Sequence, residues 1–246
     1  AYQEAYNKYY KAQEYYNTYI EPSAILSAMA GFDKLVNGIV EKINNILCPE
    51  KSEVRNNPYM APDGTEIQAD IYTYNSVSQQ VLFDRYGREV TGTDNGDGTY
   101  SFSSGEKLYM SFGGAEVPVD SYTYSMLDMD KTGYGMDDDK TVGTELFSRK
   151  GTDRYIKTTD DSGKTIYIRN NLNETDYESL YKLGNLQINP EAAQNVGKIP
   201  LSTVQGKEDF DRAKELVDAW DEKFASLNPD TVSYTHLRAH ETLRHL

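Results

Sequence analysis

Apolar residues recur at alternating steps of four and three along residues 25–46. They form one seam, which consists of Ile25, Met29, Phe32, Val36, Ile39, Ile43 and Ile46. This spacing places them on one face of an α-helix and is typical of heptad helices that pack against other helices. Tyrosines before Pro22 follow the same alternation out of phase with this seam, so a break or kink is predicted at Pro22. Both a continuous and a folded-back arrangement of residues 2–19 fit this pattern.

The pattern changes after Cys48-Pro49, where a loop rich in Asn, Pro and Gly is expected to about Gly64. Short stretches then place β-branched or aromatic residues at every second position, which predicts antiparallel strands. These stretches are residues 69–74, 79–84, 98–103, 107–112, 116–120, 121–127, 153–159 and 164–169. Between two of them, Asn95-Gly96 and Asp97-Gly98 predict a tight turn with positive backbone φ.

A second helix is predicted near the end of the chain, after a loop with one short helical turn following Pro190. Its apolar residues alternate again by three and four, and they are Phe210, Ala213, Val217, Trp220, Phe224 and Leu227. The simplest arrangement pairs this seam with the first. The predicted fold class is therefore α+β, with long heptad helices pairing into a rod and an inserted antiparallel β-rich domain. An ordinary α+β fold, in which both helices pack on the β domain, is the alternative.

The same pattern predicts the domain organisation. Residues 1–48 form a helical rod arm, residues 49–200 a β-rich inserted domain, and residues 201–232 the returning helix of the rod. The stretch VSYTHLRAHET resembles a translated sequencing adaptor, so residues 233–246 are predicted to be a non-native tail.

All three histidines lie in this tail. His236 and His240, four residues apart, would share a helix face and could bind zinc with Glu241 nearby, but the order is not that of the zinc-protease motif. Because the tail is predicted to be non-native, no metal site is assigned there.

Composition narrows the possible partners. A formal net charge of −14 and a pI of about 4.7 argue against nucleic acid and anionic membrane surfaces, which an acidic protein repels. The single cysteine, Cys48, allows no internal disulfide and lacks the neighbouring ligands of a zinc site. The 21 tyrosines suit half-exposed strands and wide protein contacts, and an aromatic platform for carbohydrate is the alternative interpretation.

One acidic segment partly fits a calcium-binding loop. Asp128, Asp130, Thr132 and Asp139 fall at ligand positions, although the last ligand should be Glu and no amphipathic helices flank the segment. A solvated acidic turn is therefore the favoured interpretation. No nucleophile motif, phosphate-binding loop or histidine base precedes the tail, and a carboxylate pair of the glycosidase type is left open.

Four segments taken in order resemble the flagellar hook-associated protein of the hook-filament junction, the FlgK type. They are FDKLVNGIVEKINNIL, GTELFSRKGTDRY, YKLGNLQINPE and EDFDRAKELVDAWDEKFASLNPDTVS. The resemblance covers residues 24–232, and the order of the segments is more specific than any one of them. The terminal segments by which the family polymerises have no counterpart here.

The resemblance implies a non-enzymatic structural subunit that is exported without a cleaved signal peptide and joins the hook to the filament outside the cell. Its implied partners are the hook protein, the filament-side junction protein, further copies of itself in a ring and an export chaperone, with neither nucleic acid nor membrane. No cofactor is implied. The alternative function is an extracellular adhesin module that binds calcium or glycan through its Tyr-rich strands and the Asp128–Asp139 loop.

Overall fold

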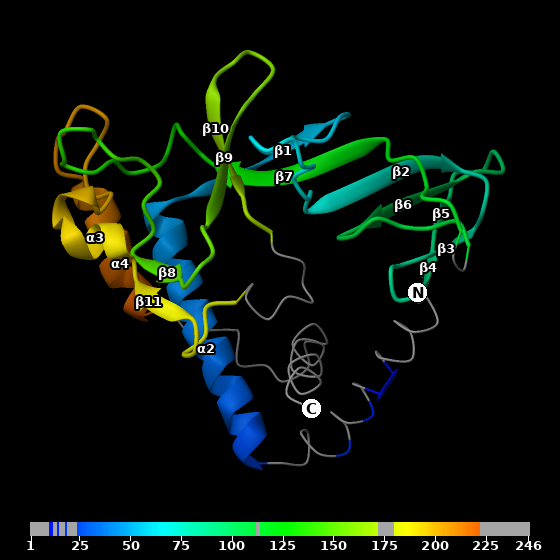
Figure 1. Cartoon of the computed structure of the whole chain (residues 1–246), viewed down its shortest axis with the longest axis horizontal. Coiled ribbons are helices and arrows are strands. Elements are labelled where there is room, and N and C mark those ends of the chain that lie inside the picture. Colours follow the sequence, from blue (N-terminus) through cyan, green and yellow to red (C-terminus); the bar gives the residue numbers. More distant parts are fainter. Residues whose placement is uncertain are drawn as a thin grey trace.

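The computed structural model describes residues 10–11, 14, 18, 24–111, 114–171 and 180–221. Two lobes are joined by one long strand, β7 (Ser121–Leu127), which runs from one to the other (Figure 1). The helical lobe contains α2 (Ala24–Leu47), β8 (Phe147–Arg149), β11 (Leu186–Ile188), α3 (Pro190–Gln194), the short 3-10 helix η3 (Val196–Lys198) and α4 (Phe210–Asp221). The β lobe contains β2 (Ile71–Val77), β3 (Val81–Phe83), β4 (Glu89–Thr91), β5 (Thr93–Asp94) and β6 (Tyr100–Ser104).

Three further strands complete the main sheet next to β7. They are β1 (Glu50–Arg55), β9 (Tyr155–Thr159) and β10 (Thr165–Arg169). The strand order is β5-β6-β2-β7-β10-β9, with β1 on the other side of β7, and every pairing is antiparallel. Two small two-stranded sheets, β3-β4 and β8-β11, flank it.

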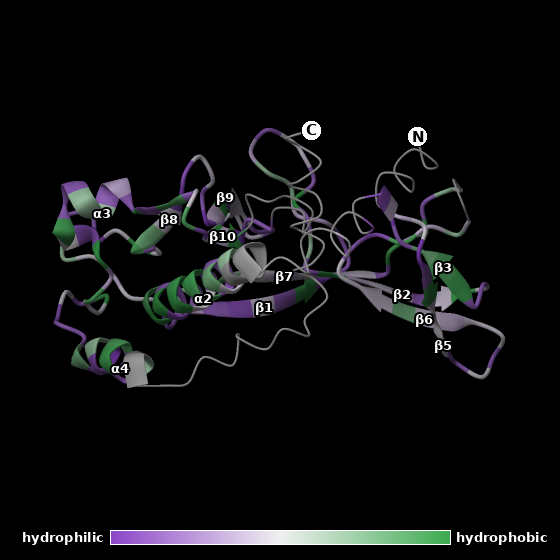
Figure 2. Ribbon diagram, turned by 90° about the horizontal axis from the view of Figure 1, so that it is seen from below, coloured by the Kyte–Doolittle hydropathy of each residue, from purple (hydrophilic) through white to green (hydrophobic). Residues whose placement is uncertain are grey.

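The alternation of side chains along β7 separates two hydrophobic cores, because successive residues of a strand point to opposite faces. Tyr124 and Met126 enter the larger core of the β lobe. Leu127 faces the other way, into a smaller core with Ile43, Leu47 and Cys48 at the end of α2. The C-terminal end of α2 therefore packs against the end of β7 that leaves the β lobe, and Figure 1 shows the rest of the helix running away from the sheet. Figure 2 gives the same region seen from below.

The glycine-rich turn between β5 and β6 forms where the sequence predicts it. Gly96 and Gly98 have φ of 80° and 85°, values that residues with a side chain rarely adopt. The side chain of Asp94 accepts a hydrogen bond from the Gly96 amide at 2.8 Å, which fixes the turn.

The predicted fold class is wrong. The described residues form mostly antiparallel sheet with three α-helices, and the helices do not make a long rod. The physical reason is that only the C-terminal end of the α2 seam is covered, and by a mixed core: Ile43 and Leu47 pack on Leu127, with Tyr155 and Tyr167 at its border, whereas Met29 and Phe32 are 53% and 50% exposed. A seam that is already covered in this way cannot serve as the interface of a helical pair along its whole length.

The helix α4 does lie against the C-terminal half of α2, in antiparallel orientation, but it does not use the predicted seam. Leu216 and the buried Ala219 face inward, whereas Phe210 and Val217 are 73% and 65% exposed. The domain boundaries at residues 48, 200 and 232 stay a prediction. The tail at 233–246 lies outside the described residues.

Candidate functional site: a charged groove over a buried ionic cluster

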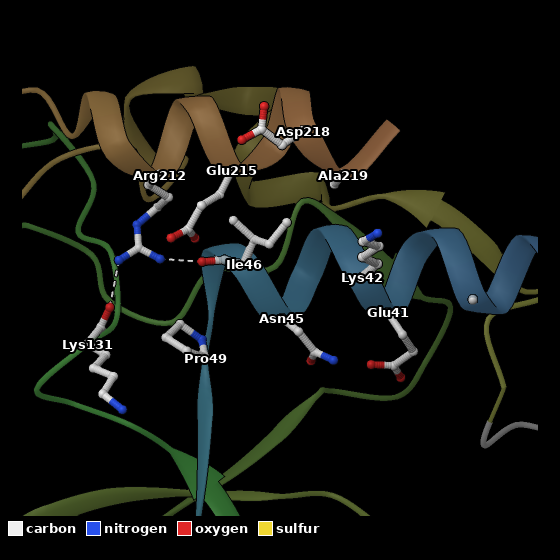
Figure 3. Close-up of a pocket in the computed structure, with 11 residues that line it drawn as sticks. Glu41, Lys42, Asn45, Ile46, Pro49, Lys131, Arg212, Glu215, Asp218 and Ala219 are labelled. Carbon is white, nitrogen blue, oxygen red and sulfur yellow. Dashed lines mark hydrogen bonds between the residues drawn. The ribbon is translucent and has the colours of Figure 1, made fainter. Parts of the chain in front are cut away.

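An open groove of about 910 Å³ runs between α2 and α4 (Figure 3). Its walls carry both signs of charge. The lining residues are Gly38, Glu41, Lys42, Asn45, Ile46, Pro49, Lys131, Arg212, Glu215, Asp218 and Ala219. The groove thus offers a polar surface bordered by two helices.

Arg212 ties the two helices together at one end of the groove. Its guanidinium donates to the carbonyls of Ile46, near the end of α2, and of Lys131, at 2.6 Å in the latter case. Its Nε donates to Asp209 at 3.1 Å, so the side chain is held from three directions. Together with the inward-facing Leu216 and Ala219, this clamp explains why α4 follows α2 although Phe210 and Val217 point to solvent.

Glu41, on the groove wall, belongs to an ionic cluster that we define as Glu41, Glu50, Arg154 and Arg169. Arg154, at the start of β9, is 3% exposed and lies 3.1 Å from both Glu41 and Glu50. Arg169, at the end of β10, reaches the same two carboxylates, 3.0 Å from Glu50. The cluster therefore fastens α2 and β1 to the hairpin of β9 and β10 with alternating charges.

The electrostatics of the cluster keep its members charged. Burial opposes ionisation of Glu41, but the charges of Arg169 and Arg154 outweigh it and lower the pKa of the carboxyl. Burial likewise opposes the charge of Arg154, yet Tyr155, Glu41, Tyr181 and Glu50 raise its pKa. A carboxylate held between two guanidiniums has no proton to give at neutral pH, so Glu41 is unsuited to general acid catalysis.

A second set of buried polar groups lies beside the ionic cluster. The Asn44 side chain is fully buried; its oxygen accepts from the amides of Leu146 and Phe147, and its nitrogen donates to the Phe147 carbonyl at 2.8 Å. The Tyr181 hydroxyl donates to Glu145 at 2.5 Å and accepts from Arg154 at 3.2 Å. One side chain of α2 thus fixes the chain that leads into β8, and Tyr181 connects this chain to the cluster.

Glu145 provides a test at varying pH. Burial raises the pKa of its carboxyl above the ordinary 4.5, against the hydrogen bond from Tyr181 and the charge of Arg154. The stabilisation that comes with this raised pKa is complete below pH 4.5 and is lost as the pH rises through the folded-state pKa. Glu145→Gln, which stays neutral, should therefore gain unfolding free energy relative to the unchanged chain as the pH rises from 4 to 8. Urea unfolding at several pH values measures this difference, and a difference that is constant with pH would contradict it.

The structure distributes the predicted seam residues among different environments. Ile43 is buried and Ile39 borders the same core, Val36 and Ile46 are half-buried, and Met29 and Phe32 are 53% and 50% exposed. The Ile25 and Trp220 side chains, and residues Phe224 and Leu227, lie outside the described part. Phe210 and Val217 of the second seam are 73% and 65% exposed, so they are not buried against the first seam.

The alternative of a calcium loop at Asp128, Asp130, Thr132 and Asp139 finds no support in the positions of these residues. Asp128 is buried, and its carboxylate accepts from the amide of Asp130 at 3.1 Å and pairs with Lys131. Its carbonyl accepts from Thr132, while Asp139 lies on the exposed stretch beyond Gly135. Among the described residues, no three acidic, cysteine or histidine side chains form a group that could hold a metal ion.

No pattern in the sequence predicts the ionic cluster. Its members are ordinary charged residues spread over a helix and three strands, and no spacing links Glu41 to Arg154 or Arg169. The tail histidines also lie outside the described residues. Comparison of the chain with protein-family models, with curated proteins and with solved structures found no match. Over the described ranges, no helix has the length and apolar character needed to cross a membrane.

Proposed function

We propose that the chain is a non-enzymatic structural subunit of a bacterial flagellum, of the kind that joins hook to filament. One observation carries the proposal: the four segments that resemble the junction protein come together in the fold. Residues 32–47, 143–155 and 181–191 meet beside the ionic cluster through Asn44, Glu145, Tyr181 and Arg154. The described part of 208–233 joins residues 32–47 through the bond of Arg212 to the Ile46 carbonyl. Segments that are distant in the sequence but share one structural unit are expected when a resemblance reflects a common fold.

The exposed apolar face of α4 is the part of this unit that we assign to a neighbouring axial subunit. Phe210 and Val217 lie seven residues apart on one helix face and are both largely exposed. On α2, Met29 and Phe32 are also half-exposed. Large apolar side chains gathered on helix surfaces are typical of protein contacts, and the groove beside them, whose walls carry both signs of charge, favours a partner with charged groups that complement it.

Binding of the whole chain to purified hook protein and to the filament-side junction protein tests this function. Saturable binding to at least one of them is expected, and Phe210→Ser combined with Val217→Ser should weaken it by about tenfold, or roughly 1.4 kcal/mol. Val54→Ser is the matched control, because Val54 is 65% exposed on the sheet and away from α4. Binding to neither protein, together with a melting temperature that rises with calcium or glycan, would favour the adhesin function instead.

A further inference from the structure

Two stretches of the chain repeat one another at a constant offset of 50 residues, from 59–74 to 109–124. The identical pairs are Tyr59 and Tyr109, Met60 and Met110, Gly64 and Gly114, Glu66 and Glu116, Asp70 and Asp120, Tyr72 and Tyr122, Thr73 and Thr123, and Tyr74 and Tyr124. A repeat of this kind indicates two copies of one structural unit.

The structure relates the two copies by an approximate two-fold axis between β2 and β7. Tyr72 pairs with its own equivalent, Tyr122, while Ile71 pairs with Thr123 and Thr73 with Ser121. The flanking hydrogen bonds are reciprocal as well. The amide of Asp70 donates to the Thr123 carbonyl at 2.7 Å, and the amide of Asp120 donates to the Thr73 carbonyl at 2.8 Å.

Each copy also holds the other through a buried tyrosine. The Tyr124 hydroxyl accepts from the Tyr59 amide at 2.9 Å, and the Tyr74 hydroxyl accepts from the Leu108 amide at 2.8 Å. Leu108 takes the place expected of Tyr109, which places a one-residue insertion in the second copy. Both tyrosines are fully buried in the larger core.

The outer strands extend the symmetry. The first copy contains β1 and β2, and the second contains β6 and β7. Across the described part of these four strands, every pairing joins one copy to the other: β1 to β7, β2 to β7 and β2 to β6. Lys107, 3.0 Å from Glu66 and 3.1 Å from Glu116, ties both copies at the tips of their loops. Neither copy can therefore form its sheet without the other.

We propose that this architecture is a strand-exchange interface whose partner is a second copy of the chain. Residues 24–77 of one molecule take the place of the same residues in another, and the exposed segment 78–80 between β2 and β3 is the hinge. The bonds of α2 to Arg154 and Phe147 also join residues before the hinge to residues after it, so the exchanged form keeps them. A connection of this length favours exchange, because opening it conserves every native contact except those of the hinge.

Paired cysteines distinguish the two forms. Val54 and Thr123 are register partners across the copies, and antiparallel partners lie within disulfide range. The chain carrying Val54→Cys and Thr123→Cys is unfolded in urea, refolded at high concentration and then oxidised; Cys48 is fully buried and stays unreactive. We expect a dimer of twice 27.9 kDa by light scattering, linked between chains on a non-reducing gel. The control pair Thr159→Cys and Thr165→Cys lies after the hinge and should close within one chain in the same dimer.

Co-refolding gives a second measurement that does not depend on the double variant. Chains carrying only Val54→Cys are mixed with chains carrying only Thr123→Cys, and exchange alone brings the two cysteines into register. A monomer at every concentration, or a dimer whose 54–123 disulfide stays within one chain, would overturn the proposal. It is independent of the flagellar function, since the readout is the mass of the chain alone and no axial protein is involved.

Discussion

Arg154→Met is expected to lower the free energy of unfolding by about 3–5 kcal/mol, because it removes one partner from a buried ion pair. Arg154 is almost completely buried and approaches Glu41 and Glu50, each at 3.1 Å. Methionine fills most of the space of the arginine stem, so the loss is mainly one of charge and hydrogen bonds. Arg169 would then be the only guanidinium left between two carboxylates in a partly buried site.

Lys214→Met is the matched control, since it removes the same charge from a pair that faces solvent. Lys214 and Asp218 lie four residues apart on α4, with side chains 73% and 55% exposed. Exposed pairs of this kind contribute well below about 1 kcal/mol. Urea unfolding followed by circular dichroism compares the two variants. A loss at Arg154 no larger than the loss at Lys214 would mean that the ionic cluster does not join α2 to the sheet.

The α2 helix holds the helical lobe to the sheet by apolar and by polar contacts. The α2 helix contributes apolar side chains to the sheet through Ile43 and Leu47, and polar ones to the cluster through Glu41 and Asn44. One helix therefore serves both interfaces in its last three turns. In the first half of α2, Met29 and Phe32 are 53% and 50% exposed.

Local periodicity located the two main helices but not their surroundings. The seams predicted helix near residues 25–46 and from residue 210, and the structure has α2 at Ala24–Leu47 and α4 at Phe210–Asp221. The two seams do not pair as predicted, because a heptad pattern identifies the apolar face of a helix but not the element that packs against that face. In α2 the end of the sheet and the chain near Phe147 cover only the C-terminal end of the seam, and in α4 the small Ala219 lies inside while Val217 faces solvent.

For the strands as well, local sequence predicts strands that form by their own alternation but not those that depend on a distant partner. Alternation predicted segments in which β2, β6, β7, β9 and β10 occur. By contrast, β1, with the charged sequence EKSEVR, falls in a stretch predicted to be a loop, since its pairing with β7 is a tertiary contact that its own residues do not reveal. Residues 107–112 and 116–120 were predicted as strands, but their described part, 107–111 and 116–120, forms only isolated bridges such as Tyr109 with Glu116.

The candidate site was beyond prediction for a related reason. In an acidic chain, Glu41 and Glu50 are two carboxylates among many, and only the fold selects them as partners of Arg154. The repeat around Tyr72 and Tyr122 was different, because identical residues at a constant offset are visible in the sequence itself. Searching for internal repeats before assigning strands would have found it.

Tyr74→Ala and Tyr124→Ala are each expected to lower the free energy of unfolding by about 3–5 kcal/mol, as for other large aromatic residues removed from a core. Both side chains are fully buried, both hydroxyls accept a backbone amide of the opposite copy, and burial raises the pKa of each to about 12. The approximate symmetry therefore predicts similar losses at two positions 50 residues apart.

Phenylalanine at the same positions separates the hydroxyl from the ring. Tyr74→Phe and Tyr124→Phe leave one buried amide without its acceptor, which is expected to lower the unfolding free energy by about 1–3 kcal/mol in each case. Tyr122→Phe is the control, because Tyr122 is only half-buried and packs edge-on against Tyr72 through its ring. If Tyr74→Phe were as mild as this control while Tyr124→Phe was not, the two copies would not be equivalent. The reciprocal bonding that makes each copy depend on the other would then hold in one direction only.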